Sequence, residues 1–358
     1  MTSPLETAAK VPPRRYAAKL ASWSIRCLHS SYRLRSPSYA SSTKASPRPL
    51  TDRDRPATGR AFRRFVGIGL GGGRGKTTAV ARLDLAGDDR RLVVSEARTR
   101  VGLRGGGVPG PSRLAFRDDV LLSWIREWVD DSTVVAIDAP LTLPPCLTCP
   151  LACPGFEACQ VPVVVWMRTH AARLANKSPR RDPQKPWVTP YTQRATELLL
   201  EHATLAPREA LGQGMGPLAA RAAFLRRATA GRLRLHENLL EVHPRATLIR
   251  RFGADVERRS RRAENETTWE ARKQMLESLT EGVAFDRVWP ELVVRNVHVF
   301  HAVIAAMSAY LWARDGWRGP TDLVPPDGAE TLQEAVGELG DLWLEAGWIW
   351  TPPAPSES

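Results

Sequence analysis

Apolar positions along the chain predict a run of short strands followed by a helix, beginning near Phe62. Three apolar or alternating stretches, RFVGIGL, KTTAVARLDL and RRLVVSEARTR, follow one another with short polar connections. Such stretches in close succession favour an antiparallel meander. The segment DDVLLSWIREWVDD then places Leu121, Ile125 and Trp128 on one helical face, with acidic residues at its start. STVVAIDAPL predicts a buried strand ending at Asp138, so the expected order is strand, strand, strand, helix, strand.

The second half of the chain departs from this pattern. Residues 144–235 contain a cysteine cluster, a Pro/Arg-rich connection and two helical stretches, which we interpret as an insertion. LHENLLEVHP and EAGWIWTPP predict further strands. TTWEARKQMLESLTEG predicts a helix that stops at Gly282, and NVHVFHAVIAAMSAYLWARDG predicts an apolar helix that ends at Gly316. We therefore expect one α/β domain over 61–351 and a short disordered end at 352–358.

The charge is concentrated at the N-terminus. The 358 residues carry a net charge of +13, but residues 1–60 contain most of it, together with many Ser, Arg and Pro. This composition predicts a disordered tail, either an organellar transit peptide or a dispensable extension. The rest is only mildly basic, so net charge is weak evidence for nucleic-acid binding. No apolar run reaches the ~18 residues of a membrane span, and we expect a cytoplasmic protein; the oligomeric state is left open.

The glycine run GLGGGRGKTT resembles a phosphate-binding loop only partly. Such a loop needs Gly-x-x-x-x-Gly-Lys-Ser/Thr before a helix. Counting back five residues from Gly75 gives Leu70, not glycine, and the sequence after Thr77 is strand-like. A hairpin turn explains the glycines at least as well.

Two acidic residues stand at predicted strand ends. Asp138 closes VVAID and Glu241 closes NLLE. Carboxylates at neighbouring strand ends suit Mg²⁺ or Mn²⁺, and phosphodiester hydrolysis gains from two such ions about 3.5–4 Å apart. Taken alone, each acid is unremarkable, because any strand end can carry an acidic residue.

Several of these segments together resemble the domain of unknown function family 429, predicted nucleases with an RNase H-like fold. The resemblance rests on VGIGLGGGRGKTTAVARL, VVAIDAPLTLP, the cysteine run with VPVVVWMR, EVHPRATL, and HVFHAVIAAMSA with GWIWTP. It covers about 62–351 and implies an RNase H-like core: a three-stranded antiparallel meander, parallel strands and flanking helices, with the Cys-rich helical insertion. It also implies a metal-dependent nuclease site of about four acids, two of them at Asp138 and Glu241.

The chain departs from the family pattern at the other acidic positions. Gly69 stands where the first strand of the family carries Asp, and His298 and His301 stand where the last helix usually supplies Asp. The two histidines are three residues apart, hence on one helix face, and imidazole binds Mn²⁺, Zn²⁺ or iron. With Asp138, Glu241 and also His243 they could form a mixed site; alternatively they fill space between sheet and helix.

Four of the five cysteines form a second candidate metal site. CLTCPLACPGFEAC contains Cys146, Cys149, Cys153 and Cys159, a spacing that suits a structural Zn²⁺ or an iron–sulphur cluster. The alternative is a pair of disulfides, which a reducing compartment disfavours.

The basic segment that follows predicts weak nucleic-acid contacts. Arg180, Arg181 and Lys185 could meet a phosphate backbone, and Trp187 could stack on a base. A solvated charged loop is the simpler interpretation.

These observations lead to three functional hypotheses. The first is a metal-dependent nuclease with an altered acidic site, in which Asp138, Glu241, His298 and His301 are catalytic. The second is a non-catalytic module that binds nucleic acid or protein and keeps the fold and the four-cysteine site. The third is a nucleotide-dependent enzyme of the actin–kinase type, in which the glycine hairpin handles phosphates.

Overall fold

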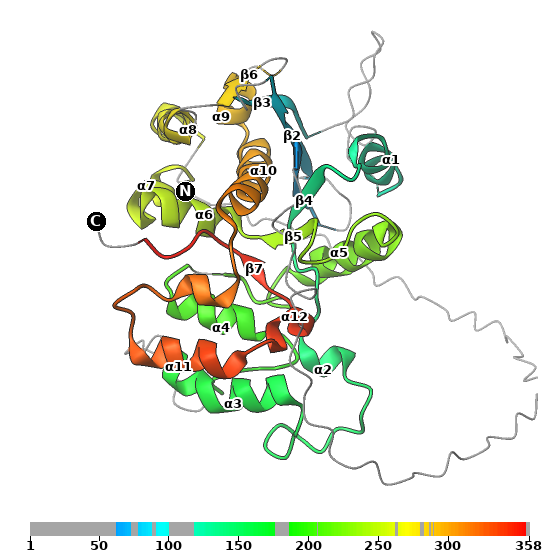
Figure 1. The fold of residues 1–358 in the computed structure, drawn as a ribbon, viewed down its shortest axis with the longest axis vertical. Helices are drawn as coiled ribbons and strands as arrows, with labels where there is room; N and C mark the ends of the chain where they lie inside the picture. The colour runs from blue at the N-terminus through cyan, green and yellow to red at the C-terminus, as the bar shows by residue number, and fades with distance from the viewer. Residues whose placement is uncertain are drawn as a thin grey trace, which may run out of the picture. The chain divides into compact units, whose positions relative to one another are not determined.

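The computed structural model describes the chain from residue 62 onward, with short gaps (Figure 1). The described residues are 62–72, 78–87, 91–99, 118–175, 186–205, 207–261, 264–279, 283–285, 288 and 290–355. The predicted tail over 1–60 and the predicted helix stop at Gly282 lie outside them. The predicted disordered end lies partly within them: Pro352 is buried, and the Ala354 N–H donates to the Asp322 carbonyl at 2.7 Å.

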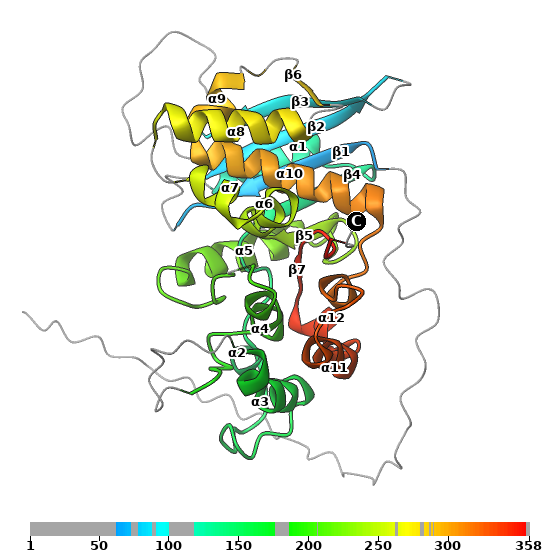
Figure 2. The same cartoon turned by 90° about the vertical axis from the view of Figure 1, so that its left-hand side faces the viewer.

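The described residues form a seven-stranded mixed sheet in the order β6-β3-β2-β1-β4-β5-β7 (Figures 1 and 2). The strands are β1 (Arg64–Gly69), β2 (Ala79–Ala86), β3 (Arg91–Arg98), β4 (Thr133–Asp138), β5 (Leu239–Val242), β6 (Val283–Phe285) and β7 (Ile349–Trp350). β2 pairs antiparallel with β1 and β3, whereas the β1–β4, β4–β5, β5–β7 and β3–β6 pairs are parallel. The predicted α/β class and antiparallel meander are confirmed, and β6 is a strand that the sequence did not indicate.

Helices cover both faces of the sheet (Figure 1). In chain order they are α1 (Asp118–Trp128), α2 (Pro145–Thr148), α3 (Pro162–Leu174), α4 (Ala195–His202), α5 (Gly216–Thr229), α6 (Pro244–Phe252), α7 (Ala254–Arg259), α8 (Glu266–Leu279), α9 (Pro290–Arg295), α10 (Val297–Asp315), the 3₁₀ helix η3 (Pro320–Leu323), α11 (Glu330–Leu339) and α12 (Leu342–Ala346). Figure 2 shows α10 lying across one face of the sheet, with α8 alongside it. None of these helices in the described part is long and apolar enough to span a membrane.

The two faces of β1 belong to two different cores because side chains alternate along a strand. Phe65 joins the cluster on the α10 side, while Val66 and Ile68 join the cluster on the α1 side. On the α10 side the helix backbone comes very close: a Cβ added at Gly67 would lie 1.9 Å from the carbonyl oxygen of Ala302. Glycine at this position therefore lets α10 pack directly against the sheet.

Both ends of α10 are capped. The Asn296 side chain accepts hydrogen bonds from the N–H groups of His298 and Val299, at 3.1 and 3.2 Å. Gly316 follows the helix with a φ of 64°, the left-handed conformation that glycine adopts without strain. The predicted end of this helix is confirmed, and the capped start holds His298 in the first turn.

The block predicted as an insertion divides between two parts of the fold. Its helices α3 and α4 lie beyond one end of the sheet with α11 and α12 (Figure 1). Trp166 Nε1 of α3 donates to the Ala335 carbonyl of α11 at 2.9 Å. α5, in contrast, packs on the α1 side of the sheet, where Ala222 and Leu225 join the core with Ile137. The block is therefore helical as expected, but α5 is part of the sheet core.

Candidate functional site

The carboxyl ends of β1, β4 and β5 meet at one edge of the sheet, near the start of α10. In the parallel register Gly69 lies opposite Asp138, and Ile137 lies opposite Glu241. These ends open onto a cavity of about 420 Å³, a volume within the range of small-molecule sites. Its acidic and histidine lining residues are Asp138, Glu241, His243, Glu257, His298 and His301. The structure thus brings the predicted acids and both α10 histidines to one cavity.

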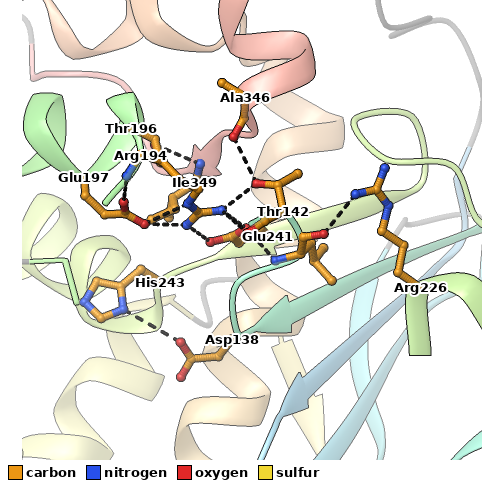
Figure 3. A network of polar contacts seen from close by, with 11 residues as sticks. Asp138, Thr142, Arg194, Thr196, Glu197, Arg226, Glu241, His243, Ala346 and Ile349 are labelled. Carbon is orange, nitrogen blue, oxygen red and sulfur yellow. Dashed lines mark hydrogen bonds and ion pairs between the residues drawn. The ribbon is translucent and has the colours of Figure 1, made fainter. Parts of the chain in front are cut away.

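His243 stands next to Asp138. Its Nδ1 lies 3.7 Å from Asp138 Oδ1 (Figure 3). His243 directly follows β5, and Pro244 begins α6 behind it, so the strand-to-helix turn places the ring beside the end of β4. The other ring nitrogen, Nε2, is buried without a hydrogen-bond partner in the described part of the chain. Because a buried nitrogen without a partner is costly, His243 has an atom available to a ligand.

Burial keeps the two α10 histidines neutral. Burial lowers the pKa of His301 to about 4; the Asp138 carboxylate opposes this shift, while His243 and nearby cations reinforce it. Burial also lowers the pKa of His298, against the opposing effect of Glu264. A neutral imidazole can offer its lone pair to a metal ion, so both side chains are in the protonation state that a ligand needs.

Position 69 has room for a side chain although it has none. A Cβ added at Gly69 would meet the His298 carbonyl oxygen at 3.6 Å, an ordinary contact. Gly69 also lines the cavity beside Asp138. Packing therefore does not close position 69, and a longer side chain there would reach the cavity.

Glu241 is placed at the site but already engaged. Arg194 Nη2 donates to its Oε1 at 2.6 Å and Arg194 Nη1 donates to its Oε2 at 2.8 Å, while the Leu141 N–H donates to Oε2 at 2.8 Å (Figure 3). To bind a metal ion, Glu241 would have to exchange one of these partners. In this arrangement its clearest role is to hold the segment that follows Asp138.

Arg194 is the site residue that sequence reasoning missed. It is completely buried and also bonds Glu197 and the Thr142 hydroxyl. Burial would lower the pKa of Arg194, but the two carboxylates outweigh it and raise the pKa above its usual range. Burial raises the pKa of Glu197 to about 7, against the effect of Arg194. No local pattern reveals this network, because Arg194 and Glu241 are 47 positions apart.

The donor set fits a single transition-metal ion better than two magnesium ions. The neutral α10 histidines, the Asp138 carboxylate and the orphaned His243 Nε2 match Mn²⁺, Zn²⁺ or Fe²⁺, whereas Mg²⁺ prefers oxygen ligands. Within the described residues, no three histidine, cysteine, aspartate or glutamate side chains stand ready to hold an ion. Binding would therefore require Asp138, His243 and His301 to close around the metal.

Three arginines make the remaining polar wall of the cavity. Arg208, Arg245 and Arg261 all line it. Arg245 and Arg261 both contact the buried carboxylate of Glu257, which also borders the cavity. Arginine side chains beside a histidine–carboxylate centre favour an anionic ligand.

The glycine run joins two antiparallel strands, as expected of a hairpin. Thr78 Oγ1 accepts from the Gly71 N–H at 3.0 Å and from Arg221 Nη1 at 2.9 Å. Residues 73–77 lie outside the described part. β2 begins at Ala79, so a strand and not a helix follows the run, which removes the helix that a phosphate loop requires. The actin–kinase alternative stays a prediction.

The four cysteines lie in the short segment made of α2 and the chain that follows it, up to Cys159. All four are free thiols; Cys146 and Cys153 are exposed and Cys159 is buried. Burial raises the pKa of Cys146, and the charges of Cys159, Cys153 and Cys149 raise it further. Like the cavity, the segment contains no ready-made ligand group in the described structure, and the four-cysteine metal site stays a prediction.

Most residues of the basic segment that were predicted to contact nucleic acid lie outside the described part of the chain. Arg180, Arg181 and Lys185 lie in the gap 176–185, whereas Trp187 is described and is 44% exposed. An exposed indole is compatible with base stacking but does not indicate it by itself.

Comparison with known proteins identifies the family and nothing beyond it. No curated protein and no solved structure matches the chain. One family model matches residues 72–330, most of the described domain. The match includes Asp138, Glu241, His243 and both α10 histidines. The chain therefore belongs to the family described as "Protein of unknown function (DUF429)".

Proposed function

We propose that the chain is a metal-dependent phosphodiester hydrolase in which a mixed histidine–carboxylate centre stands in place of an acidic one. The observation that carries this proposal is the convergence of Asp138, His243 and His301 on one cavity. The strand order β3-β2-β1-β4-β5, antiparallel and then parallel, supports the RNase H-like fold that the family resemblance implies.

Asp138, His243 and His301 would hold one divalent ion, with Mn²⁺, Zn²⁺ or Fe²⁺ as the best matches to this donor set. Such an ion supplies Lewis-acid activation of water and neutralises charge on the phosphoryl group. Asp138 contributes the negative charge at the centre. His301 stays neutral because burial lowers its pKa to about 4, and the arginines that line the cavity attract the phosphate.

Glu241 serves this centre indirectly. Its bond from the Leu141 N–H fixes the segment that begins at Asp138, and Arg194 holds Glu241 in place. The same segment is held from outside by Arg226 Nη1, which donates to the Leu141 carbonyl at 2.9 Å (Figure 3). A ligand at the end of β4 is precise only when the backbone carrying it is rigid.

The test is cleavage of single-stranded, duplex and hybrid nucleic acids with Mn²⁺, Zn²⁺, Fe²⁺ or Mg²⁺. Asp138→Asn should abolish metal-dependent cleavage, whereas Asp131→Asn, at an exposed position just before β4, should cleave like the unmodified protein. Two outcomes would overturn the proposal. One is cleavage that persists in Asp138→Asn, and the other is that the folded, unmodified protein cleaves with none of the metals.

The second candidate is a non-catalytic module that binds nucleic acid or protein. Two observations favour it: Gly69 provides no ligand, and Glu241 is bonded to Arg194. Asp138 makes no hydrogen bond within the described residues and has the His243 ring beside it. This candidate predicts that the folded protein binds a partner and that no metal produces cleavage.

A further inference from the structure

We propose that Arg208, Arg245 and Arg261, which all line the cavity, form a binding site for the phosphodiester backbone of a nucleic acid. This inference rests on the proposed function in one respect: it assumes that the substrate is a phosphodiester. Binding is measured without metal, so its outcome is separate from that of the cleavage test.

The arrangement depends on one buried carboxylate. Glu257 is 3% exposed in its side chain, and its Oε1 lies 2.6 Å from Arg261 Nε and 3.2 Å from Arg245 Nε. Arg245 and Arg261 remain 34% and 42% exposed. Arg261 Nε donates a hydrogen bond to Glu257, whereas Arg245 Nε lies within ion-pair distance of it without a hydrogen bond. The terminal nitrogens of both side chains make no hydrogen bond to other described residues and are left for a ligand.

The charges at this wall do not cancel. Two guanidinium groups share one carboxylate, and Arg208 adds a third positive charge that is exposed and has no ion pair within the described chain. Guanidinium groups bond phosphate oxygens in a two-point geometry and remain charged at all relevant pH values. The wall is therefore built for an anion, and phosphate matches its donors.

Further arginines lie outside the cavity lining in the same segment, which favours a polymer over a single phosphate. Residues 245–261 contain six arginines and two acidic residues. Arg251, Arg258 and Arg259 of this segment are exposed on α6 and α7, outside the cavity lining. A chain of phosphates can use such a track, whereas a small phosphate ester would need only the cavity.

The experiment measures anisotropy of a short labelled oligothymidylate with the full chain in EDTA, over a series of NaCl concentrations. Arg208→Gln, Arg245→Gln and Arg261→Gln should each weaken binding about three- to tenfold and lower the salt slope by about 0.7, the value for one lost contact to a single strand. The matched control Arg227→Gln, an exposed arginine on α5 away from the cavity, should leave both values unchanged. The basic N-terminal residues are present in every variant, so their contribution to binding is the same in all of them.

Glu257→Gln separates positioning from bulk charge. If Glu257 positions the arginines, its loss weakens binding and lowers the salt slope despite removing a negative charge. Tighter binding by Glu257→Gln would mean that net charge alone governs the interaction, and would overturn the positioning role.

Two outcomes overturn the binding site itself. One is that the three cavity variants, shown to be folded by thermal unfolding, bind like Arg227→Gln. The other is that inorganic phosphate displaces the oligonucleotide at the same concentration as unlabelled oligothymidylate, which would make it a site for one phosphate. Binding that behaves as expected without any cleavage would count against the proposed function alone.

Discussion

Arg194 and Glu241 form a buried two-point ion pair that joins the residue before α4 to strand β5. Arg194 Nη2 and Nη1 donate to Oε1 and Oε2 of Glu241 at 2.6 and 2.8 Å, and both side chains are nearly inaccessible to solvent. Breaking one side of such a pair leaves an uncompensated buried charge.

We therefore expect Arg194→Leu to lower the free energy of unfolding by about 3–5 kcal/mol. Urea unfolding followed by circular dichroism measures this loss. Arg173→Gln breaks the exposed pair with Glu334 and should leave the free energy of unfolding nearly unchanged, because solvent screens such a pair. Equal losses of unfolding free energy in the two variants would contradict the larger contribution expected of the buried pair.

The close approach of α10 to β1 predicts different tolerance at two neighbouring glycines. Gly67→Ala would place a Cβ 1.9 Å from the Ala302 carbonyl oxygen, whereas the nearest atom to a Cβ at position 69 is the His298 carbonyl oxygen at 3.6 Å. Overpacking of this kind costs about 1–3 kcal/mol. Thermal unfolding should show a lower midpoint for Gly67→Ala and little change for Gly69→Ala; the reverse order would mean that α10 lies elsewhere.

Restoring the acid that the first strand lacks should improve metal binding. Gly69→Asp has room for its side chain and stands opposite Asp138. An added carboxylate ligand should tighten Mn²⁺ binding on the order of tenfold. Calorimetric titration with Mn²⁺ measures the affinity, and Gly337→Asp, in open space on α11, is the control. Equal affinities for the two variants would show that position 69 does not face the metal.

Burial of His236 should make the protein sensitive to acid. Burial, with a smaller effect of Arg226, lowers the pKa of His236 to about 4 from an ordinary 6.5. The unfolded chain therefore binds a proton that the folded chain excludes as pH falls from 6.5 to 4, and the free energy of unfolding falls by up to about 1.4 kcal/mol per pH unit.

His236→Asn should remove this share of the pH dependence. Asn tolerates the positive φ of 66° at this position. Urea unfolding at several pH values between 4 and 7.5 should show that the free energy of unfolding of this variant falls less steeply with falling pH than that of the unmodified protein. The part of the pH dependence that comes from His301 should remain. An unchanged slope would place the acid sensitivity in other groups.

The cysteine segment should contain metal in protein purified without oxygen. We expect Zn²⁺, or iron with sulphide and visible absorption, to be lost in Cys149→Ser and retained in Cys27→Ser, which alters the cysteine outside the cluster. Chelation should also lower the thermal midpoint. Folded protein that contains no metal at this segment would exclude both cofactors.

The elements that sequence reasoning predicted well are those with a strong local pattern. The first three strands, the amphipathic α1, β4 ending at Asp138 and the apolar α10 with Gly316 all follow from periodicity and termination signals. The two-residue β7 also appears where an apolar aromatic segment predicted it.

The candidate site was predictable only in part. Asp138 and Glu241 can be placed by their strands, but the ion pair that occupies Glu241 depends on a residue 47 positions away. Arg261 lies four residues after Glu257, a spacing that local sequence can indicate, but the pairing of Arg245 with Glu257 depends on how α6 and α7 fold back beside each other. Such partners are chosen by tertiary packing, and a sequence read one segment at a time contains no signal for them.

Because β7 pairs with β5, the cavity can be completed only late in synthesis of the chain. β5 is complete at Val242, yet its outer neighbour arrives only with Ile349 and Trp350. Ile349 lines the cavity, and its N–H donates to Thr196 Oγ1 at 3.1 Å, which also secures α4. Because chains emerge N-terminus first, the sheet edge behind Glu241 stays open until nearly the whole domain has left the ribosome.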